Sequence, residues 1–270
     1  PRRSQAPAER GPGPANASVA AVGTRPRGGI ALVTGASAGI GRELALLLAR
    51  DGFHLVLSAR DEARLRELAA ELEARWAATS TVIPCDLAAP DGAGTLASGI
   101  ASAGLELDVL VNNAGIGAAG PFAEVALQRH LALLQLNVTT LTELTHHFLP
   151  GMLARGRGRI LNVASTAAFQ PGPYLATYYA SKAYVLSLSE ALAEETKGTG
   201  VSVTTLCPGP TRTEFFARAN MRESMLARNA VMDAAAVAAA GYAGMMRGDR
   251  IVVPGLANRA TTMLVRLAPR

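Results

Sequence analysis

Two neighbouring tyrosines, Tyr178 and Tyr179, precede Lys182 in the segment TYYASK and could supply a phenol that donates or accepts a proton. A tyrosine hydroxyl has a pKa of about 10, so at neutral pH it needs a nearby cation to stabilise its ionised form. On a helix, side chains four positions apart share a face more squarely than those three apart. The spacing favours Tyr178 as the partner of Lys182 without excluding Tyr179.

A second chemical signal is the segment TGASAGIG, which follows an apolar run and opens a helical pattern. Glycine permits tight turns and a close approach of the backbone to a ligand, and the N-terminus of a helix attracts anions. Three glycines alone are a weak signal, but at a strand–helix junction they predict a site for a dinucleotide pyrophosphate. The residues that we expect to form it are Gly35, Ser37, Ala38, Gly39, Ile40 and Gly41.

The residues after the second apolar run indicate which dinucleotide is preferred. An NAD site usually carries an acidic residue there for the ribose 2′-hydroxyl, whereas this sequence has Ala59 followed by Arg60. A guanidinium suits a 2′-phosphate, so we expect NADP(H) to be preferred, with NAD(H) possible. Arg60 would make the choice, with Ser58 or Arg42 as candidate helpers, unless Arg60 is a solvated surface charge. Asp61 is expected to cap the next helix.

The framework that must position these residues is predicted to be an α/β domain. Short runs of Val, Ile and Leu, typical of strands buried on both faces, lie at 29–35, 54–59, 80–85, 108–113, 158–165, 201–207 and 250–255. Helical patterns lie between them, at 40–51, 61–77, 90–103, 123–154, 176–197 and 231–247. This alternation predicts one domain over 29–270, with a doubly wound, seven-stranded parallel sheet and helices on both faces.

In such a sheet, ligands bind beyond the carboxyl ends of the strands. Asp86 and Leu87 follow the third run, where they could meet an adenine amine. Asn113, Ala114 and Gly115 follow the fourth and could lie near the cofactor. The alternative is that both segments are turn chemistry, since Asn, Asp and Gly all favour turns.

Composition argues against several other classes of protein. The 270 residues are 49% hydrophobic, yet no run reaches the roughly 18 apolar residues of a membrane helix. No secretory signal is recognisable either, so we expect a cytoplasmic protein. The net charge of +5 comes mostly from arginines in residues 1–28, a Pro-, Arg- and Gly-rich segment expected to be a flexible tail. The near-neutral remainder disfavours nucleic-acid binding, and Cys85, Cys207 and the four histidines form no metal-binding pattern.

The motifs TGASAGIG, NNAG, YYASK and PGPTRT occur together with Asn137 and Ser165 in one characteristic order. This order resembles the short-chain dehydrogenase/reductase family from about residue 29 to residue 255, and the style of the sequence is similar to bacterial ketone and 3-oxoacyl reductases. The resemblance implies a single-domain Rossmann fold. It maps the family's Tyr-x-x-x-Lys motif onto Tyr178 and Lys182, which leaves Tyr179 as a neighbour that packs.

The resemblance also implies a role for each catalytic residue. Tyr178 would exchange a proton with the substrate oxygen while hydride is transferred at carbon. Lys182, together with the positively charged nicotinamide ring of the oxidised complex, would lower the pKa of Tyr178, and it would also hydrogen-bond the nicotinamide ribose. Ser165 would polarise the substrate oxygen, and Asn137 would anchor a water. Further cofactor contacts are implied from the loop that contains Pro208, Gly209, Thr211 and Thr213.

The substrate end is less defined by the sequence. A lid is expected at about 210–230, including Phe215, Phe216 and Met221, with an apolar wall formed by Phe169, Pro171, Tyr174 and Leu175. Such a wall suits a hydrophobic ketone, alcohol or acyl substrate, although arginines 212, 218 and 222 leave an acidic group open. The segment 254–270 could be an amphipathic helix that packs on the body, on a partner subunit or on a lipid surface.

The resemblance implies a homodimer or homotetramer. Two other functions are compatible with parts of this pattern: a non-catalytic NAD(P)-sensing protein on the same fold, and an epimerase of the extended branch. The complete catalytic set disfavours the first. The loop spacing TGxxxGxG and the short chain after the seventh strand disfavour the second.

Overall fold

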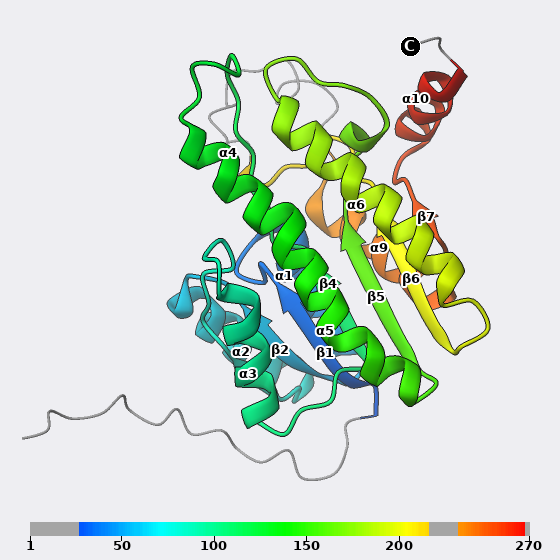
Figure 1. The fold of residues 1–270 in the computed structure, drawn as a ribbon. Coiled ribbons are helices and arrows are strands. Elements are labelled where there is room, and N and C mark those ends of the chain that lie inside the picture. The colour runs from blue at the N-terminus through cyan, green and yellow to red at the C-terminus, as the bar shows by residue number, and fades with distance from the viewer. Residues whose placement is uncertain (1–26, 216–231, 268–270) are drawn as a thin grey trace, which may run out of the picture.

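A computed structural model describes residues 27–215 and 232–267, which fold around one seven-stranded sheet (Figure 1). The strands are β1 Gly29–Thr34, β2 Phe53–Ser58, β3 Ser80–Val82, β4 Val109–Asn112, β5 Gly158–Val163, β6 Val201–Leu206 and β7 Ile251–Val252. Every neighbouring pair is parallel, and the order β3-β2-β1-β4-β5-β6-β7 reverses direction between β1 and β4. The predicted doubly wound Rossmann sheet is therefore confirmed.

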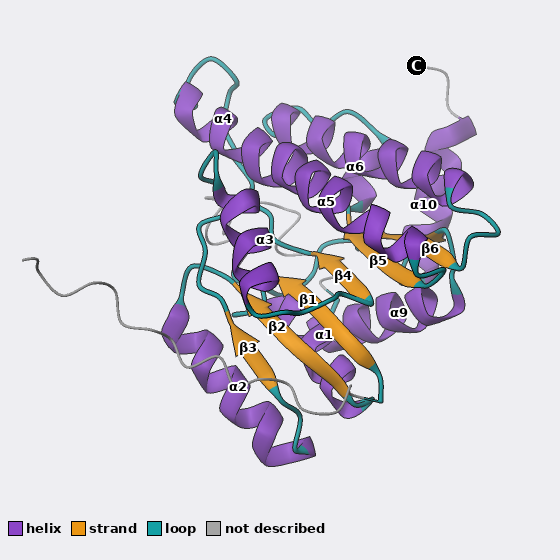
Figure 2. Cartoon of the chain, turned by 60° about the horizontal axis from the view of Figure 1, so that its bottom comes forward, coloured by secondary structure: helices purple, strands orange, loops and turns teal. Residues whose placement is uncertain are grey.

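Helices cover both faces of the sheet (Figure 2). The first face is covered by α1 Gly39–Arg50, α2 Glu62–Trp76 and α9 Ala234–Arg247, and the second by α3 Gly92–Ser102, α5 Leu141–Ala154 and α6 Ala176–Glu195. Because successive side chains of a strand point to opposite faces, Ala31 and Val33 pack into the first layer while Ile30 and Leu32 pack into the second. Two buried apolar layers thus hold the sheet between the helices.

The long helix predicted over 123–154 is continuous from residue 127 to residue 154, but it starts four residues later than expected and is not α-helical throughout. The structure has α4 Leu127–Leu134, a π-helical turn η1 Gln135–Thr140, and then α5. A π-helical turn inserts an extra residue into the α-helical hydrogen-bond pattern and is frequent at functional sites. This one contains Asn137, whose amide bonds to a neighbouring loop. The C-terminal helix α10 Leu256–Leu267 lies where the sequence suggested an amphipathic helix over 254–270, whereas the short 3₁₀ helix η2 Thr166–Phe169 was not expected.

A buried chain of amides and hydroxyls crosses the middle of the sheet. Asn112 of β4 and Asn162 of β5 are paired in register, and Asn112 Nδ2 donates to Asn162 Oδ1 at 2.9 Å. Asn112 Nδ2 also donates to Thr145 Oγ1 of α5 at 3.0 Å, and Asn162 Nδ2 donates to Ser189 Oγ of α6 at 2.9 Å. The four residues are buried, so these bonds replace water for most of their polar groups; Asn112 Oδ1 alone among the side-chain oxygens and nitrogens of the four has no partner within the described residues. They connect the two central strands to α5 and α6.

The predicted tail at 1–28 lies outside the described residues except for its last two positions. Most of the predicted lid, residues 216–230, lies outside them as well. Among the helices that the structure does describe, none combines the length and apolarity needed to cross a bilayer.

Candidate functional site

A cavity of about 680 Å³ opens at the carboxyl ends of the strands. Most of the predicted site residues line it, namely Gly35, Ser37, Ala38, Gly39, Ile40, Arg60, Asp86, Leu87, Asn113, Ala114, Gly115, Ser165, Tyr178, Lys182, Pro208, Gly209, Thr211 and Thr213. Gly41 and Asn137 do not line the cavity themselves, but each contacts residues that do. Within the described part of the chain, no three His, Cys, Asp or Glu side chains form a group that could hold a metal ion.

The glycine loop between β1 and α1 has the geometry that close backbone contact requires. Gly35 and Gly39 adopt positive φ angles of 66° and 57°, where a side chain would be strained. A Cβ added to Gly41 would lie 2.4 Å from both the Gly35 carbonyl oxygen and Asn113 Nδ2, so a methyl group does not fit there. These three positions are therefore glycine for a physical reason.

The start of α1 is suited to an anionic group. The helix has no side-chain hydrogen bond at its N-cap, Ala38, and no acidic residue in its first turn. Its first backbone N–H groups, together with the helix dipole, can therefore bind negative charge beside the cavity. Small residues with no competing cap thus fit the pyrophosphate of a dinucleotide.

Asn113 joins the loop after β4 to the glycine loop. Its Nδ2 donates to the Thr34 carbonyl at 2.9 Å, and its backbone N–H donates to Thr34 Oγ1 at 3.0 Å. The backbone N–H of Ala114 donates to the same hydroxyl at 3.1 Å. These bonds fix the two loops on either side of the point where the strand order reverses.

The end of β2 places Ala59, Arg60 and Asp61 along the cavity, with no acidic residue at the first of these positions. Ala59 and the exposed Arg60 line the cavity, and within the described residues the Arg60 guanidinium has no ion pair or hydrogen bond. Asp61 caps α2 as predicted, because its Oδ1 accepts the Arg64 N–H at 3.1 Å. The suggested helpers are less suitable: Ser58 is fully buried and Arg42 forms ion pairs with Glu71 and Glu43.

Asp86 and Leu87 lie at the far end of the cavity. The Asp86 Oδ1 accepts the Ala88 N–H at 3.1 Å, which is turn chemistry, but the exposed carboxylate still lines the cavity. The Leu87 carbonyl accepts a hydrogen bond from Thr140 Oγ1 at 2.7 Å, so this loop is held by the π-helical turn. The turn chemistry is therefore observed, and the contact of Asp86 with an adenine amine stays a prediction.

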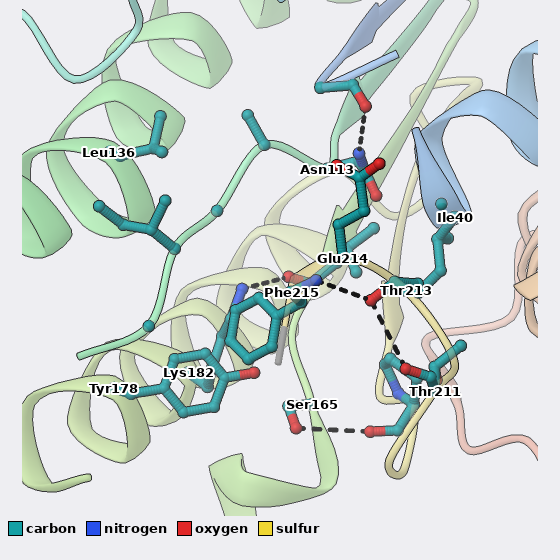
Figure 3. A pocket seen from close by; sticks show the side chains of 18 of the residues that line it. Ile40, Asn113, Leu136, Ser165, Tyr178, Lys182, Thr211, Thr213, Glu214 and Phe215 are labelled. Carbon is teal, nitrogen blue, oxygen red and sulfur yellow. Dashed lines mark hydrogen bonds between the residues drawn. The ribbon is translucent and has the colours of Figure 1, made fainter. Parts of the chain in front are cut away.

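Tyr178, Ser165 and Lys182 meet at the other end of the cavity (Figure 3). Burial raises the pKa of the Tyr178 hydroxyl to about 12, and a hydrogen bond with Ser165 partly opposes this. Ser165, which directly follows the end of β5 and Ala164, is itself held because its Oγ accepts the Ala167 N–H at 3.1 Å. The serine hydroxyl is thus fixed next to the phenol.

Lys182 Nζ donates to the Val163 carbonyl at 2.8 Å, and burial lowers the pKa of Lys182 to about 8. Among the residues of the chain, burial of the phenol has the largest effect on the pKa of Tyr178, so the lowering expected from Lys182 together with an oxidised nicotinamide stays a prediction. The lowering would require the added positive charge of an oxidised nicotinamide.

Asn137 is held at the π-helical turn by both ends of its amide. Its Oδ1 accepts the Ile116 N–H and its Nδ2 donates to the Ile116 carbonyl, both at 3.0 Å. Nδ2 also donates to Ser181 Oγ at 3.1 Å. A Cβ on Gly115 would lie 3.2 Å from Asn137 Oδ1 and 3.5 Å from Lys182 Nζ, so the amide and the ammonium lie on the same side of Gly115.

Tyr179 is held differently from Tyr178. A Cβ on Gly172 would lie 2.4 Å from the Tyr179 ring, so this ring packs closely against the glycine. The two tyrosine rings are nearly perpendicular, at 76°. Because a hydrogen bond to Ser165 is assigned to Tyr178, the geometry favours Tyr178 as the reactive phenol, as the four-residue spacing suggested.

The loop after β6 closes one side of the cavity. A Cβ on Gly39 would lie 2.9 Å from Thr213 Cγ2, so this loop touches the glycine loop across the cavity. Thr211 Oγ1 donates to the Gly209 carbonyl at 2.9 Å, which stabilises the turn after Pro208. Glu214 forms an ion pair of 2.8 Å with Arg64 of α2.

The apolar wall differs from the one predicted. Leu175 lines the cavity, and Phe215 stacks near Tyr178 with ring centroids 5.3 Å apart. Phe169 instead packs beneath the cavity with Leu141 and Val185, while Tyr174 is 68% exposed and Pro171 is also exposed. Within the 3₁₀ helix η2, Thr166 and Ala167 line the cavity, whereas Phe169 at its end packs into the core.

Phe216 and Met221 lie outside the described residues. Lining residues that the sequence did not reveal include Gln170, Leu136 and Ile116. They carry no motif: Ile116 and Gln170 lie in the loops that precede α4 and α6, and Leu136 lies in the π-helical turn η1.

Comparison with known proteins agrees with this geometry. The pattern of the short chain dehydrogenase family matches residues 29–224. A very-long-chain 3-oxoacyl-CoA reductase from Laccaria bicolor is 39% identical over 179 residues, which is 66% of this chain but 53% of the relative. The chain therefore spans about half the length of this curated relative.

Two solved structures cover more of the chain. A short-chain dehydrogenase from Sphingobium yanoikuyae in complex with NADPH has a TM-score of 0.79 and 31% identity, covering 89% of this chain and 96% of its own. A short-chain dehydrogenase/reductase from Burkholderia phymatum in complex with NAD has a TM-score of 0.78 and 27% identity, covering 87% and 92%. With its Rossmann sheet, glycine loop and Tyr-x-x-x-Lys pair, the chain belongs to the short-chain dehydrogenase family.

Proposed function

We propose that this oxidoreductase interconverts a carbonyl and a secondary alcohol, with NADP(H) as its preferred cofactor. The observation that carries this proposal is the convergence of Tyr178, Ser165 and Lys182 at one end of a cavity whose other end is formed by the glycine loop. A nucleotide laid along the cavity would have its pyrophosphate at α1 and its nicotinamide next to Tyr178. The bound nicotinamide would supply or accept the hydride.

The residues of the chain would handle the proton and the substrate oxygen. In the reductive direction, Tyr178 donates its proton to the oxygen as the carbon gains hydride; in the reverse direction, the phenolate accepts it. Ser165 donates a hydrogen bond to the same oxygen. Lys182 would hydrogen-bond the nicotinamide ribose and stabilise the phenolate, while Asn137 holds the loop at Ile116 and α6 through Ser181.

The preference for NADP(H) is supported by the end of β2. A carboxylate that would accept the 2′-hydroxyl of NAD is lacking at Ala59, and the exposed Arg60 lies at the cavity edge. A guanidinium can form two charge-assisted hydrogen bonds to a 2′-phosphate. Since relatives have been solved with either nucleotide, a side-by-side comparison of NADPH and NADH is needed.

A hydrophobic substrate, either a ketone or a 3-oxoacyl thioester, is supported by the wall of Leu175, Tyr179 and Phe215 around Tyr178. The Laccaria relative is a reductase of very-long-chain 3-oxoacyl-CoA, which belongs to the second of these classes. Cytoplasmic location and assembly as a homodimer or homotetramer are also proposed, on the family resemblance alone.

The proposal is tested by oxidation of NADPH and NADH with a panel of ketones, aldehydes and 3-oxoacyl thioesters. We expect turnover with NADPH and a hydrophobic carbonyl compound. Tyr178→Phe should lower kcat by about 100-fold to 10,000-fold, the usual contribution of general acid catalysis. Its matched control, Tyr179→Phe, should change kcat by less than about tenfold, because only the edge of a packed ring is altered.

Fluorescence of bound NADPH completes this test. Both variants should retain nucleotide binding, since the phenol is not needed to hold the pyrophosphate. Nucleotide binding without turnover on the whole panel would indicate a sensing protein. A larger loss for Tyr179→Phe than for Tyr178→Phe would refute the assignment of the phenol.

A further inference from the structure

Helix α10 turns its apolar side away from the protein. Leu256, Met263 and Leu264 are 83%, 64% and 66% exposed, whereas Thr262 is buried at 6%. At about 100° per residue, the three exposed side chains fall within a sector of about 100°, while Asn258 and Thr262 fall on the opposite side. An amphipathic helix of a globular protein normally buries its apolar face. Here Thr262 is buried and Asn258 is half-buried, while the apolar stripe is left without a partner among the described residues.

This orientation is fixed by specific contacts of the inner side. Asn258 Nδ2 donates to the Pro254 carbonyl at 2.8 Å and contacts Met232 Sδ at 3.3 Å. A Cβ on Gly209 would lie 2.5 Å from Asn258 Nδ2, so the amide packs directly on that glycine. Rotating the helix to bury its leucines would break these contacts. The exposed stripe is therefore a built feature of the surface.

The charge around the stripe is of one sign. Residues 255–270 contain Arg259, Arg266 and Arg270 and no aspartate or glutamate. On the helical wheel, Arg259 falls beside Met263 at the edge of the stripe, where a long side chain can extend toward a charged surface. A helix with leucine and methionine on one side and flanking arginines has the composition of helices that lie at the surface of anionic membranes.

We propose that α10 docks this protein on an anionic lipid surface, with Leu256, Met263 and Leu264 inserted at the boundary between headgroups and acyl chains. A second copy of the chain is a poorer occupant. Pairing α10 with its own copy would bring arginines together without any carboxylate in this segment. Three large side chains also cover only part of the roughly 800 Å² per partner that a stable dimer buries.

The location of α10 links the proposed surface to the site. The helix packs against η2, which directly follows Ser165, and it lies beyond the tip of β7 on the side toward which β5 points (Figure 1). Gly209, which contacts Asn258, lines the cavity. A membrane under α10 would therefore lie on the same side of the molecule as the cavity.

The test is co-sedimentation of the full chain with vesicles of phosphatidylcholine alone or mixed with phosphatidylglycerol. We expect binding to the mixed vesicles and at least about tenfold weaker binding of the double variant Met263→Gln/Leu264→Gln. The matched control is Leu127→Gln/Leu131→Gln, which removes two leucines that are 61% and 54% exposed on α4. This control should bind like the unchanged protein.

Electrostatics provides a second comparison. Arg259→Gln should weaken binding to the mixed vesicles about fivefold, and Arg259→Lys should restore it. All variants keep the arginines of residues 1–28, so a difference between them reports on α10 alone. NADPH fluorescence and a thermal melt of each variant establish that the fold is intact.

Three results would overturn the proposal. The unchanged protein could fail to bind the mixed vesicles, or the α10 double variant could bind them as tightly as the control does. In the third result, light scattering gives the α10 double variant a smaller oligomer than the unchanged protein, and the unchanged protein does not bind vesicles. That outcome would assign the stripe to contact between copies of the chain.

Discussion

Replacing Lys182 by methionine would test how the ionisation of Tyr178 is controlled. Burial raises the pKa of Tyr178 to about 12 and lowers that of Lys182 to about 8, so neither group is set for catalysis by burial alone. Lys182 Nζ lies 5.8 Å from the centroid of the Tyr178 ring. With an effective dielectric constant of about 20, two unit charges at this separation interact by about 3 kcal/mol. This energy corresponds to about two pKa units.

The direction of the effect follows from which form reacts. Oxidation of an alcohol needs the phenolate, and a neighbouring ammonium stabilises the phenolate, so Lys182 lowers the pKa of Tyr178 in the reacting complex. In Lys182→Met, the pH at which kcat for oxidation reaches half its maximum should rise by about two units. At a pH below both midpoints, kcat should fall by about 100-fold. Arg at position 182 keeps the charge and should leave the midpoint nearly unchanged.

The assay is the pH profile of kcat for alcohol oxidation at saturating NADP⁺, compared for the unchanged protein, Lys182→Met and Lys182→Arg. Saturation separates the effect on ionisation from the loss of nucleotide binding, which appears in KM. A Lys182→Met profile with the original midpoint and only a lower plateau would refute the reasoning. Lys182 would then act by holding the nucleotide and not through the phenol.

Two further predictions concern the nucleotide. Arg60→Ala should weaken NADPH binding by about tenfold or more while leaving NADH binding unchanged, because a charged hydrogen bond to the 2′-phosphate is lost. Calorimetric titrations measure both affinities, and equal weakening of NADPH and NADH binding would count against the role of Arg60. Gly41→Ala should lower both the melting temperature and the affinity for NADPH, because its Cβ would lie 2.4 Å from the Gly35 carbonyl. Gly94→Ala is the matched control, since nothing lies within 4 Å of its added Cβ and alanine favours the helix by about 1 kcal/mol. Equal melting temperatures for these two variants would show that the loop can accommodate a side chain.

Much of the sheet could be predicted from the sequence because its signal is local. Runs such as ALVT in β1 and ILNV in β5 are apolar enough to mark strands buried on both faces. Their order in space follows from general rules for parallel sheets. The third strand was predicted too long, ending at Cys85 instead of Val82, because a run of apolar residues continues beyond its last paired position.

What escaped prediction depends on contacts between distant segments. The π-helical turn around Asn137 exists together with hydrogen bonds to Ile116 and Leu87, and no periodicity in the sequence reveals such partners. The wall of the cavity was assigned to Phe169 and Tyr174 because aromatic residues suit a pocket. The turn of η2 and the loop before α6 direct these side chains elsewhere. The pKa of Tyr178 was likewise predicted from its neighbours alone, without the cost of enclosing the phenolate.

The paired asparagines of β4 and β5 favour one register between the two strands. Sliding either strand by one position would turn its amide to the other face of the sheet and leave the second amide without its partner in the interior. A misaligned sheet would therefore bury an amide without a hydrogen-bond partner, which costs free energy and disfavours the wrong register. Asn162 stands three positions before Ser165 on the same segment, and Ser189 stands two turns after Lys182 on the same helix. The register that these hydrogen bonds favour thus helps to set the distances between Ser165, Tyr178 and Lys182.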